Sequence, residues 1–139
     1  MVARRTSAEP TPREEERVVV LVVEDYAPTR EALAESLEDA GFRVEQAMSG
    51  REAILIAQKV KPSVILMDLS LPGVDGSEAT QMLKADERTR EIPVIAVSGH
   101  RRKQQEALAA GCADFIEKPL VSEDVEARIR RLLRGKPKP

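Results

Sequence analysis

Acidic, hydroxyl and amine side chains follow short apolar runs at four points of this sequence. The clearest is Asp68, which ends the apolar run 64–67 and precedes a turn containing Pro72 and two glycines. Short apolar runs bounded by turn residues are typical of strands buried on both faces. A carboxylate in such a place is costly to bury unless something pairs with it. The other three runs end in Glu24-Asp25, Ser98 and Lys118.

These residue types together suit phosphoryl transfer onto a carboxylate. Three carboxylates brought to one place repel one another unless a cation neutralises them. Mg²⁺ fits because it takes hard oxygen ligands in octahedral geometry at about 2.0–2.1 Å. Lys118 adds a positive charge that could pair with an anion on Asp68, and the Ser98 hydroxyl could bind an anionic oxygen. Since positioning and charge neutralisation carry most of this chemistry, the residues predict a phosphoacceptor at Asp68.

Five strand patterns alternate with five helical patterns and would place these side chains together. Strands are predicted for residues 18–23, 43–47, 63–67, 92–97 and 113–117. Helices are predicted to begin near Pro28, Ser49, Asp75, Arg101 and Ser122. The pairs Ser49/Glu52 and Asp75/Glu78 have the spacing of capping boxes, and Ser122 is predicted to cap the last helix. Gly41 and Gly111 are predicted to end the first and fourth helices. This alternation predicts βα units on a parallel sheet with helices on both faces. All five strands would then end at one edge, where ligands of such sheets collect.

Size and composition predict one soluble cytoplasmic domain. The chain has 139 residues, 42% hydrophobic and only 2% aromatic, so aliphatic side chains must fill its core. The net charge of −2 gives no general attraction to nucleic acid or membrane, and no apolar run is long enough to span a bilayer. One cysteine excludes an internal disulfide. Residues 1–17 are expected to be a disordered charged tail, 18–134 the domain, and 135–139 a short C-terminal tail.

The four motifs together resemble the receiver domain of bacterial two-component response regulators. They are Glu24-Asp25, the stretch Asp68 to Gly76, Ser98-Gly99 and Lys118-Pro119. The resemblance covers about residues 18–134 and implies a flavodoxin-like, doubly wound (βα)5 fold with a five-stranded parallel sheet in the order 2-1-3-4-5. This strand order comes from the resemblance, since the alternation of strands and helices does not by itself determine it.

The resemblance also implies a role for each matching residue. Asp68 would accept the phosphoryl group from a phosphohistidine on a partner. Mg²⁺ would be held by Glu24, Asp25, Asp68 and the backbone carbonyl of Ser70. Lys118 would pair with the acyl phosphate, and its bond to Pro119 is expected to be cis. Ser98 would turn toward the phosphoryl oxygens while Phe115 rotates inward, a local charge event that biases a two-state element.

Two positions depart from the family pattern. Phe115 stands where the family often has tyrosine, so it keeps the ring but lacks a hydroxyl for signalling. Glu24 replaces the commoner aspartate, and its longer side chain is expected to reach Mg²⁺ directly or through water. Of the remaining polar residues, Asp75 is predicted to cap a helix rather than bind metal, and His100 to lie exposed in a loop. The basic stretches 101–103 and 128–134 are predicted to be solvated helix faces.

The function expected from these residues is that of a single-domain response regulator. It would take phosphate from a histidine kinase or phosphotransfer protein and then bind a downstream target protein. It would catalyse only its own Mg²⁺-dependent phosphorylation and dephosphorylation, so it is not expected to be a conventional enzyme. A monomer or a weak dimer through the fourth helix, fifth strand and fifth helix is expected. The alternative is a receiver-like scaffold that works without phosphate.

Two other interpretations fit poorly. Aspartate-nucleophile phosphatases carry the motif Asp-x-Asp after their first strand. In this chain Asp68 follows the third predicted strand, and the residue two positions later is Ser70 and not an aspartate. Flavin binding on this kind of sheet needs a Ser/Thr/Gly-rich phosphate loop after the first strand. The segment 24–28 is instead acidic and contains a proline.

Overall fold

The computed structural model describes residues 17–135, in which five strands alternate with five α-helices. In chain order these are β1 (Val19–Val23), α1 (Ala27–Asp39), β2 (Arg43–Ala47), α2 (Gly50–Val60), β3 (Val64–Asp68), α3 (Gly76–Ala85), β4 (Val94–Ser98), α4 (Gln104–Ala110), β5 (Asp114–Glu117) and α5 (Ser122–Arg134). The tails predicted for residues 1–17 and 135–139 lie outside the described residues, except for Arg17 and Gly135.

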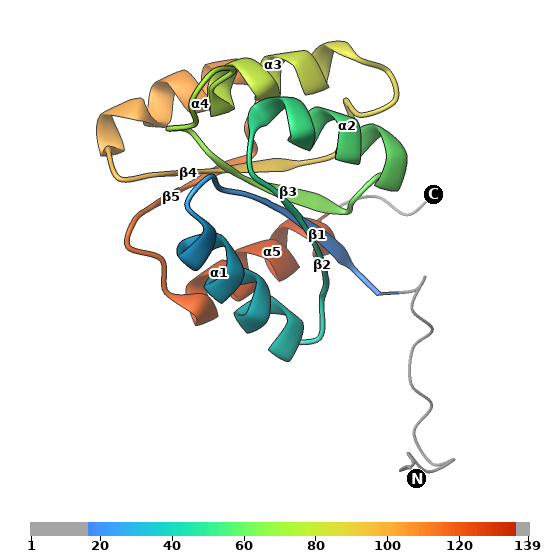
Figure 1. Cartoon of the computed structure of the whole chain (residues 1–139), viewed down its shortest axis with the longest axis vertical. Helices are drawn as coiled ribbons and strands as arrows, with labels where there is room; N and C mark the ends of the chain where they lie inside the picture. Colours follow the sequence, from blue (N-terminus) through green and yellow to red (C-terminus); the bar gives the residue numbers. More distant parts are fainter. Residues whose placement is uncertain (1–16, 136–139) are drawn as a thin grey trace, which may run out of the picture.

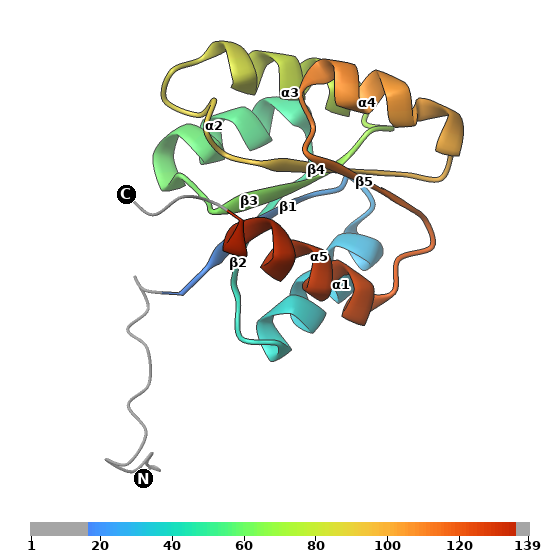
Figure 2. The ribbon, with the colours of Figure 1, turned by 180° about the vertical axis from the view of Figure 1, so that it is seen from behind.

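The strands form one parallel sheet in the order β2-β1-β3-β4-β5. Helices α2, α3 and α4 cover one face, and α1 and α5 cover the other (Figure 1; Figure 2 gives the reverse view). The predicted doubly wound fold and its strand order are therefore confirmed. Because β1 and β3 are neighbours, with Val23 beside Met67, the residues that follow these two strands meet at one edge of the sheet.

The core consists of two aliphatic layers, one on each face of the sheet. Leu21, Ile65 and Met67 point to the layer under α2, α3 and α4. Val20 and Leu66 point to the layer under α1 and α5. Since successive strand residues face opposite sides, a strand buried on both faces needs the unbroken apolar runs seen in the sequence. Each fully buried side chain of this kind contributes roughly 1.5–3 kcal/mol, so these layers fix the strand ends that carry the site.

Helix ends largely follow the sequence, with one correction. Ser49 Oγ accepts the Glu52 N–H at 3.1 Å, and Asp75 Oδ1 accepts the Glu78 N–H at 2.9 Å, so both predicted caps are confirmed. Gly41 follows the end of α1 with a φ of 104°. The prediction that Ser122 caps α5 is wrong. Val121 holds that position and Ser122 is already helical; its hydroxyl instead hydrogen-bonds the Ser36 hydroxyl of α1 at 2.8 Å.

Several boundaries shift by one or two residues. β3 includes Asp68 as its last residue, so the acid belongs to the strand itself. β4 begins at Val94 rather than at Ile92, because the Ile92 N–H donates back to the Thr89 carbonyl in a turn. The fourth helix opens with a short 3₁₀ turn, Arg101–Lys103, before α4 proper. Among residues 17–135, none of the helices is long and apolar enough to cross a membrane.

Candidate functional site

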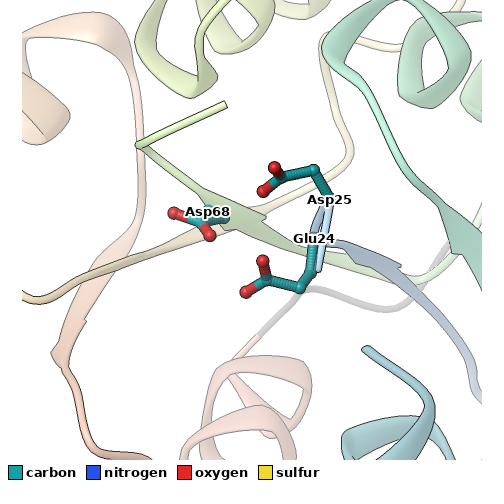
Figure 3. Close-up of side chains that lie close together, drawn as sticks. All are labelled: Glu24, Asp25 and Asp68. Atoms are coloured by element: carbon teal, nitrogen blue, oxygen red, sulfur yellow. The ribbon is translucent and has the colours of Figure 1, made fainter. Parts of the chain in front are cut away.

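Three carboxylates gather at the carboxyl ends of β1 and β3 (Figure 3). One oxygen from each of Glu24, Asp25 and Asp68 lies within 4.8 Å of the others. Asp68 is 4% exposed and Glu24 is 7% exposed, whereas Asp25 lies at the surface. The sequence predicted this convergence from the strand ends alone, and the neighbouring positions of β1 and β3 produce it.

Backbone amides hold two of the carboxylates in place. The Ser70 N–H donates to Asp68 Oδ1 at 2.8 Å, and the Tyr26 N–H donates to Glu24 Oε2 at 3.0 Å. Arg30, on the first turns of α1, donates from Nη1 to the Glu24 carbonyl at 2.9 Å and from Nε to Gln46 on β2 at 3.1 Å. The role of Arg30 was not predicted, because its helical position alone does not indicate which loop it reaches.

Lys118 joins the cluster from the end of β5. Its Nζ lies 3.2 Å from Asp68 Oδ2 and 3.4 Å from Glu24 Oε1. Burial alone would lower the pKa of Lys118, but the carboxylates of Asp68 and Glu24 outweigh it and hold that pKa above its usual value. The ammonium is therefore charged at neutral pH and offers a positive group next to Asp68. The Lys118-Pro119 bond is cis, as predicted.

The donor set fits a hard divalent cation. Burial raises the pKa of Glu24, and the nearby Asp68 raises it further. The hydrogen bond from the Tyr26 N–H lowers this pKa but does not cancel the rise. A carboxyl group with a raised pKa is one whose charge is poorly compensated where it lies. Three carboxylates face a single ammonium within the cluster, and all the ligating atoms are oxygens of the kind that Mg²⁺ prefers.

Gly76 allows α3 to begin directly against the site. A Cβ at this position would collide with the carbonyl oxygen of Asp68 and would lie 2.8 Å from the Cα of Leu69. Only glycine permits so close an approach of the helix to the strand end. The turn between Asp68 and Gly76 is thereby kept short and tight, and Ser70 stays exposed at its start.

The other predicted residues lie around this centre at different depths. Ser98 is fully buried and follows Val97, which pairs with Asp68 across β4 and β3. The Ser98 Oγ accepts the His100 N–H at 3.0 Å. Phe115 is 7% exposed and belongs to the core layer under α2, α3 and α4. His100 is exposed, as predicted.

Two arginines of the basic stretch in α5 contact other elements and are not simply solvated, contrary to the prediction for this helix face. Arg128 bonds to Asp114 and to the Phe115 carbonyl of β5. Arg130 donates to the Ala40 carbonyl at 3.0 Å, and its guanidinium lies 4.6 Å from the ring centre of Phe42. These two arginines make tertiary contacts that helical spacing alone could not reveal.

A groove of about 680 Å³ lies beside the cluster, between the start of α1 and the loop after β5. Lys118 lines it, together with apolar side chains that include Ala32, Leu33, Pro119 and Leu120. The cluster therefore borders a surface that a partner molecule could contact.

Comparison with known proteins agrees with this geometry. Residues 20–130 match the family described as the response regulator receiver domain. The chain belongs to this family. Receiver domains are signalling domains of two-component systems and not conventional enzymes.

Individual relatives support the same family. The chain is 37% identical over 117 residues to the phosphate regulon transcriptional regulatory protein PhoB of Pseudomonas aeruginosa, covering 83% of this chain and 51% of PhoB. It is 38% identical over 103 residues to the polar-differentiation response regulator DivK of Brucella ovis, covering 73% of this chain and 84% of DivK. The chain thus spans about half the length of the first curated relatives that it matches.

Solved structures give the same fold. The receiver domain of a sensor histidine kinase from Pseudomonas aeruginosa superposes with a TM-score of 0.80 at 28% identity, covering 86% of this chain and 99% of that one. That structure carries a magnesium ion coordinated in its active-site cleft.

Proposed function

We propose that Asp68 accepts a phosphoryl group from a phosphohistidine of a protein donor, in a Mg²⁺-dependent reaction. The observation that carries this proposal is the position of Lys118 Nζ, 3.2 Å from a buried Asp68 carboxylate that lies beside two further carboxylates. A buried acid beside an ammonium is suited to hold a phosphoryl group, and the two further carboxylates are suited to hold the Mg²⁺ that would neutralise its charge.

In the proposed step, the N–P bond of the phosphohistidine breaks and its electron pair stays on the imidazole nitrogen. A bond from an Asp68 carboxylate oxygen to phosphorus forms at the same time. Lys118 balances the negative charge of the phosphoryl oxygens, and the Ser70 N–H orients the Asp68 carboxylate. Glu24, Asp25, Asp68 and the Ser70 carbonyl would hold Mg²⁺, which would supply further charge neutralisation.

Ser98 and Phe115 are proposed to respond to the new phosphoryl group. The Ser98 oxygen accepts the His100 N–H, so its own O–H proton remains available to donate to a phosphoryl oxygen. Phe115 is already buried, with only 7% of the residue exposed, so an inward rotation can bury little more of its ring. We therefore propose that phosphorylation changes the position of the β5 backbone at Phe115 more than it changes the burial of the Phe115 ring.

The groove beside Lys118 is proposed as the place where the phosphate donor approaches. Its apolar lining and its contact with the cluster suit a protein that brings a histidine side chain to Asp68. A downstream target protein would then be bound according to the phosphorylation state. The single-domain arrangement expected from the sequence stays a prediction, because the chain spans 84% of DivK but only 51% of PhoB.

Intact-protein mass after incubation with acetyl phosphate tests this function. Wild type should gain one phosphoryl adduct that requires Mg²⁺, and Asp68→Asn should gain none. Asp75→Asn is the matched control, since it changes a nearby helix-capping acid and should keep the adduct. Absence of the adduct both from acetyl phosphate and from a phosphohistidine protein, together with no calorimetric Mg²⁺ binding, would contradict the proposal and favour a phosphate-independent scaffold.

A further inference from the structure

Strand β5 forms a free edge of the sheet. Within residues 17–135, it pairs with β4 on one side only. Its Lys118 N–H, just past the strand, donates to the Ser98 carbonyl of β4 at 2.9 Å. Because alternate residues of a parallel strand direct their backbone groups to opposite sides, Phe115, three residues earlier, directs its N–H and C=O toward the open side. Such groups need other partners or remain available for pairing with another chain.

Two side chains satisfy these outward backbone groups. Asp114 Oδ1 accepts the Phe115 N–H at 2.8 Å, and Arg128 Nη1 donates to the Phe115 carbonyl at 3.2 Å. The same Nη1 lies 3.1 Å from each Asp114 carboxylate oxygen. We call this arrangement the Arg128 clasp: Arg128, Asp114 and the backbone of Phe115.

The clasp links β5 to α5, which also share a core layer through Ile116 of β5 and Val125 of α5. Arg128 belongs to α5, where its Nε also pairs with Asp124 at 3.2 Å. The helix packs into the layer under α1 and α5, whereas the Phe115 ring packs into the layer on the opposite face. The clasp therefore joins a residue of one core layer to the helix that covers the other layer.

The surroundings allow the clasp to act at the surface. The side chains of Arg128 and Asp114 are each 29% exposed, so their pairing is only partly screened by solvent. They line a groove of about 320 Å³ between α4 and α5 that also contains Arg101 and Glu117. A shift of the clasp would change the shape and charge of this groove.

We propose that Arg128 is a positioning residue that fastens the backbone of Phe115 to α5. A change in β5 at Phe115 then reaches α5 and the groove beside it through the clasp. This inference deepens the proposed function, on which it rests, by naming the contact that carries the response from the phosphoacceptor edge to the surface. Neither Arg128 nor Asp114 touches the carboxylate cluster, so phosphoryl uptake itself does not depend on them.

The test compares Arg128→Gln and Asp114→Asn with the control Asp124→Asn. Arg128→Gln removes the bonds of Arg128 to the Asp114 carboxylate and to the Phe115 carbonyl. Asp114→Asn removes the ion pair but keeps an acceptor for the Phe115 N–H. Asp124→Asn removes only the partner of Arg128 within α5. Amide exchange of Phe115, followed by NMR on unphosphorylated protein, should be about tenfold faster in Arg128→Gln, because β5 is then no longer fastened to α5. It should be less accelerated in Asp114→Asn, which keeps the acceptor of the Phe115 N–H, and nearly unchanged in the control. Melting curves confirm that each variant is folded.

The second measurement uses the phosphorylated state. All variants should form the acetyl phosphate adduct to the same extent as wild type, seen by intact mass. Wild type and Asp124→Asn should then show phosphorylation-dependent chemical-shift changes along α5, and the two clasp variants should lose most of them. A merely structural role would alter stability but not the response of α5 to phosphorylation.

The outcomes separate the two proposals. Unchanged Phe115 exchange in Arg128→Gln, or a full α5 response in the phosphorylated variant, would overturn the clasp. If wild type forms no adduct from acetyl phosphate or from a phosphohistidine protein and binds no Mg²⁺, the proposed function fails. The exchange measurement on unphosphorylated protein then decides by itself whether the clasp fastens Phe115 to α5.

Discussion

Lys118 and Asp68, which are 50 positions apart in sequence, form an ion pair across the end of the sheet, with 3.2 Å between Nζ and Oδ2. Strand β4 lies between the strands that carry them. The lysine side chain therefore crosses the end of β4 to reach the acid. This pair, and the second contact of Lys118 with Glu24, hold β1, β3 and β5 together at the edge where the carboxylates meet.

Replacing Lys118 should strengthen cation binding while it weakens phosphoryl uptake. The ammonium competes with a divalent cation for the same carboxylates, so Lys118→Met should raise Mg²⁺ affinity by about three- to tenfold, since about 1.4 kcal/mol is a factor of ten. The adduct from acetyl phosphate should form more slowly than in wild type. Calorimetric titration measures the affinity, and Lys59→Met, an exposed lysine on α2, is the control. Weaker Mg²⁺ binding in Lys118→Met would contradict the prediction.

Asp75 should behave as a helix cap and not as a metal ligand. Asp75→Ala removes the acceptor of the Glu78 N–H and should lower the free energy of unfolding by about 1 kcal/mol. Its Mg²⁺ affinity should equal that of wild type. Ser122→Ala is the comparison, because Ser122 caps nothing, and it should cost less than about 0.5 kcal/mol. Urea unfolding and calorimetry together check this, and a large loss of Mg²⁺ affinity in Asp75→Ala would make Asp75 part of the site.

Adding one methyl group at Gly76 should be strongly destabilising. The new Cβ would strike the Asp68 carbonyl, so α3 must move away from the end of β3. We expect Gly76→Ala to lower the free energy of unfolding by about 2–3 kcal/mol, the upper range for overpacking. Gly99→Ala is the matched control, since its Cβ would have nothing within 4 Å, and it should be nearly neutral. Equal effects of the two substitutions would show that the close approach at Gly76 is unimportant.

Cys112 should make stability depend on alkaline pH. Burial raises the pKa of the Cys112 thiol, and hydrogen bonding with Thr80 opposes the rise only in part. A raised folded-state pKa means that the unfolded state releases its proton first. The stabilising contribution is therefore complete below the ordinary thiol pKa of 9.0 and is lost as pH rises through the folded-state value.

Urea unfolding at pH 7.5, 9 and 10 checks this sign. These pH values are chosen to bracket a thiol pKa of about 8.5 to 9 and above. Wild type should lose free energy of unfolding along this series more steeply than Cys112→Ala, which lacks the thiol but keeps every lysine. The difference between the two proteins isolates the cysteine. Parallel pH profiles would show that Cys112 is not responsible.

The strands, the helices and the residues at the centre of the site could be predicted because they depend on periodic or local patterns, whereas the strand order came from the family resemblance. Unbroken apolar runs identify strands buried on two faces, and the residue after each run must lie at the common edge, as Glu24 and Asp68 do. Asp75 was recognisable as a cap because its acceptor and donor are three residues apart.

The features that were missed depend on contacts between distant segments. Arg128 and Arg130 have the spacing of a solvated helix face, yet each reaches a backbone carbonyl of another element. Arg30 reaches the Glu24 carbonyl in the same way. A long flexible side chain can either extend into solvent or donate to a backbone carbonyl of another element. Which carbonyls these arginines bind is determined only by the packing of α1 and α5 on the sheet.

Tyr26 gives the site a spectroscopic reporter of its own. The chain has one tyrosine and no tryptophan. The Tyr26 residue is 63% exposed, and its N–H donates to Glu24 Oε2. Tyrosine emission from the unmodified protein therefore comes from the residue whose backbone N–H binds the carboxylate cluster. We expect occupation of that cluster to change this emission, which can be measured without a label and without background from a second tyrosine or a tryptophan.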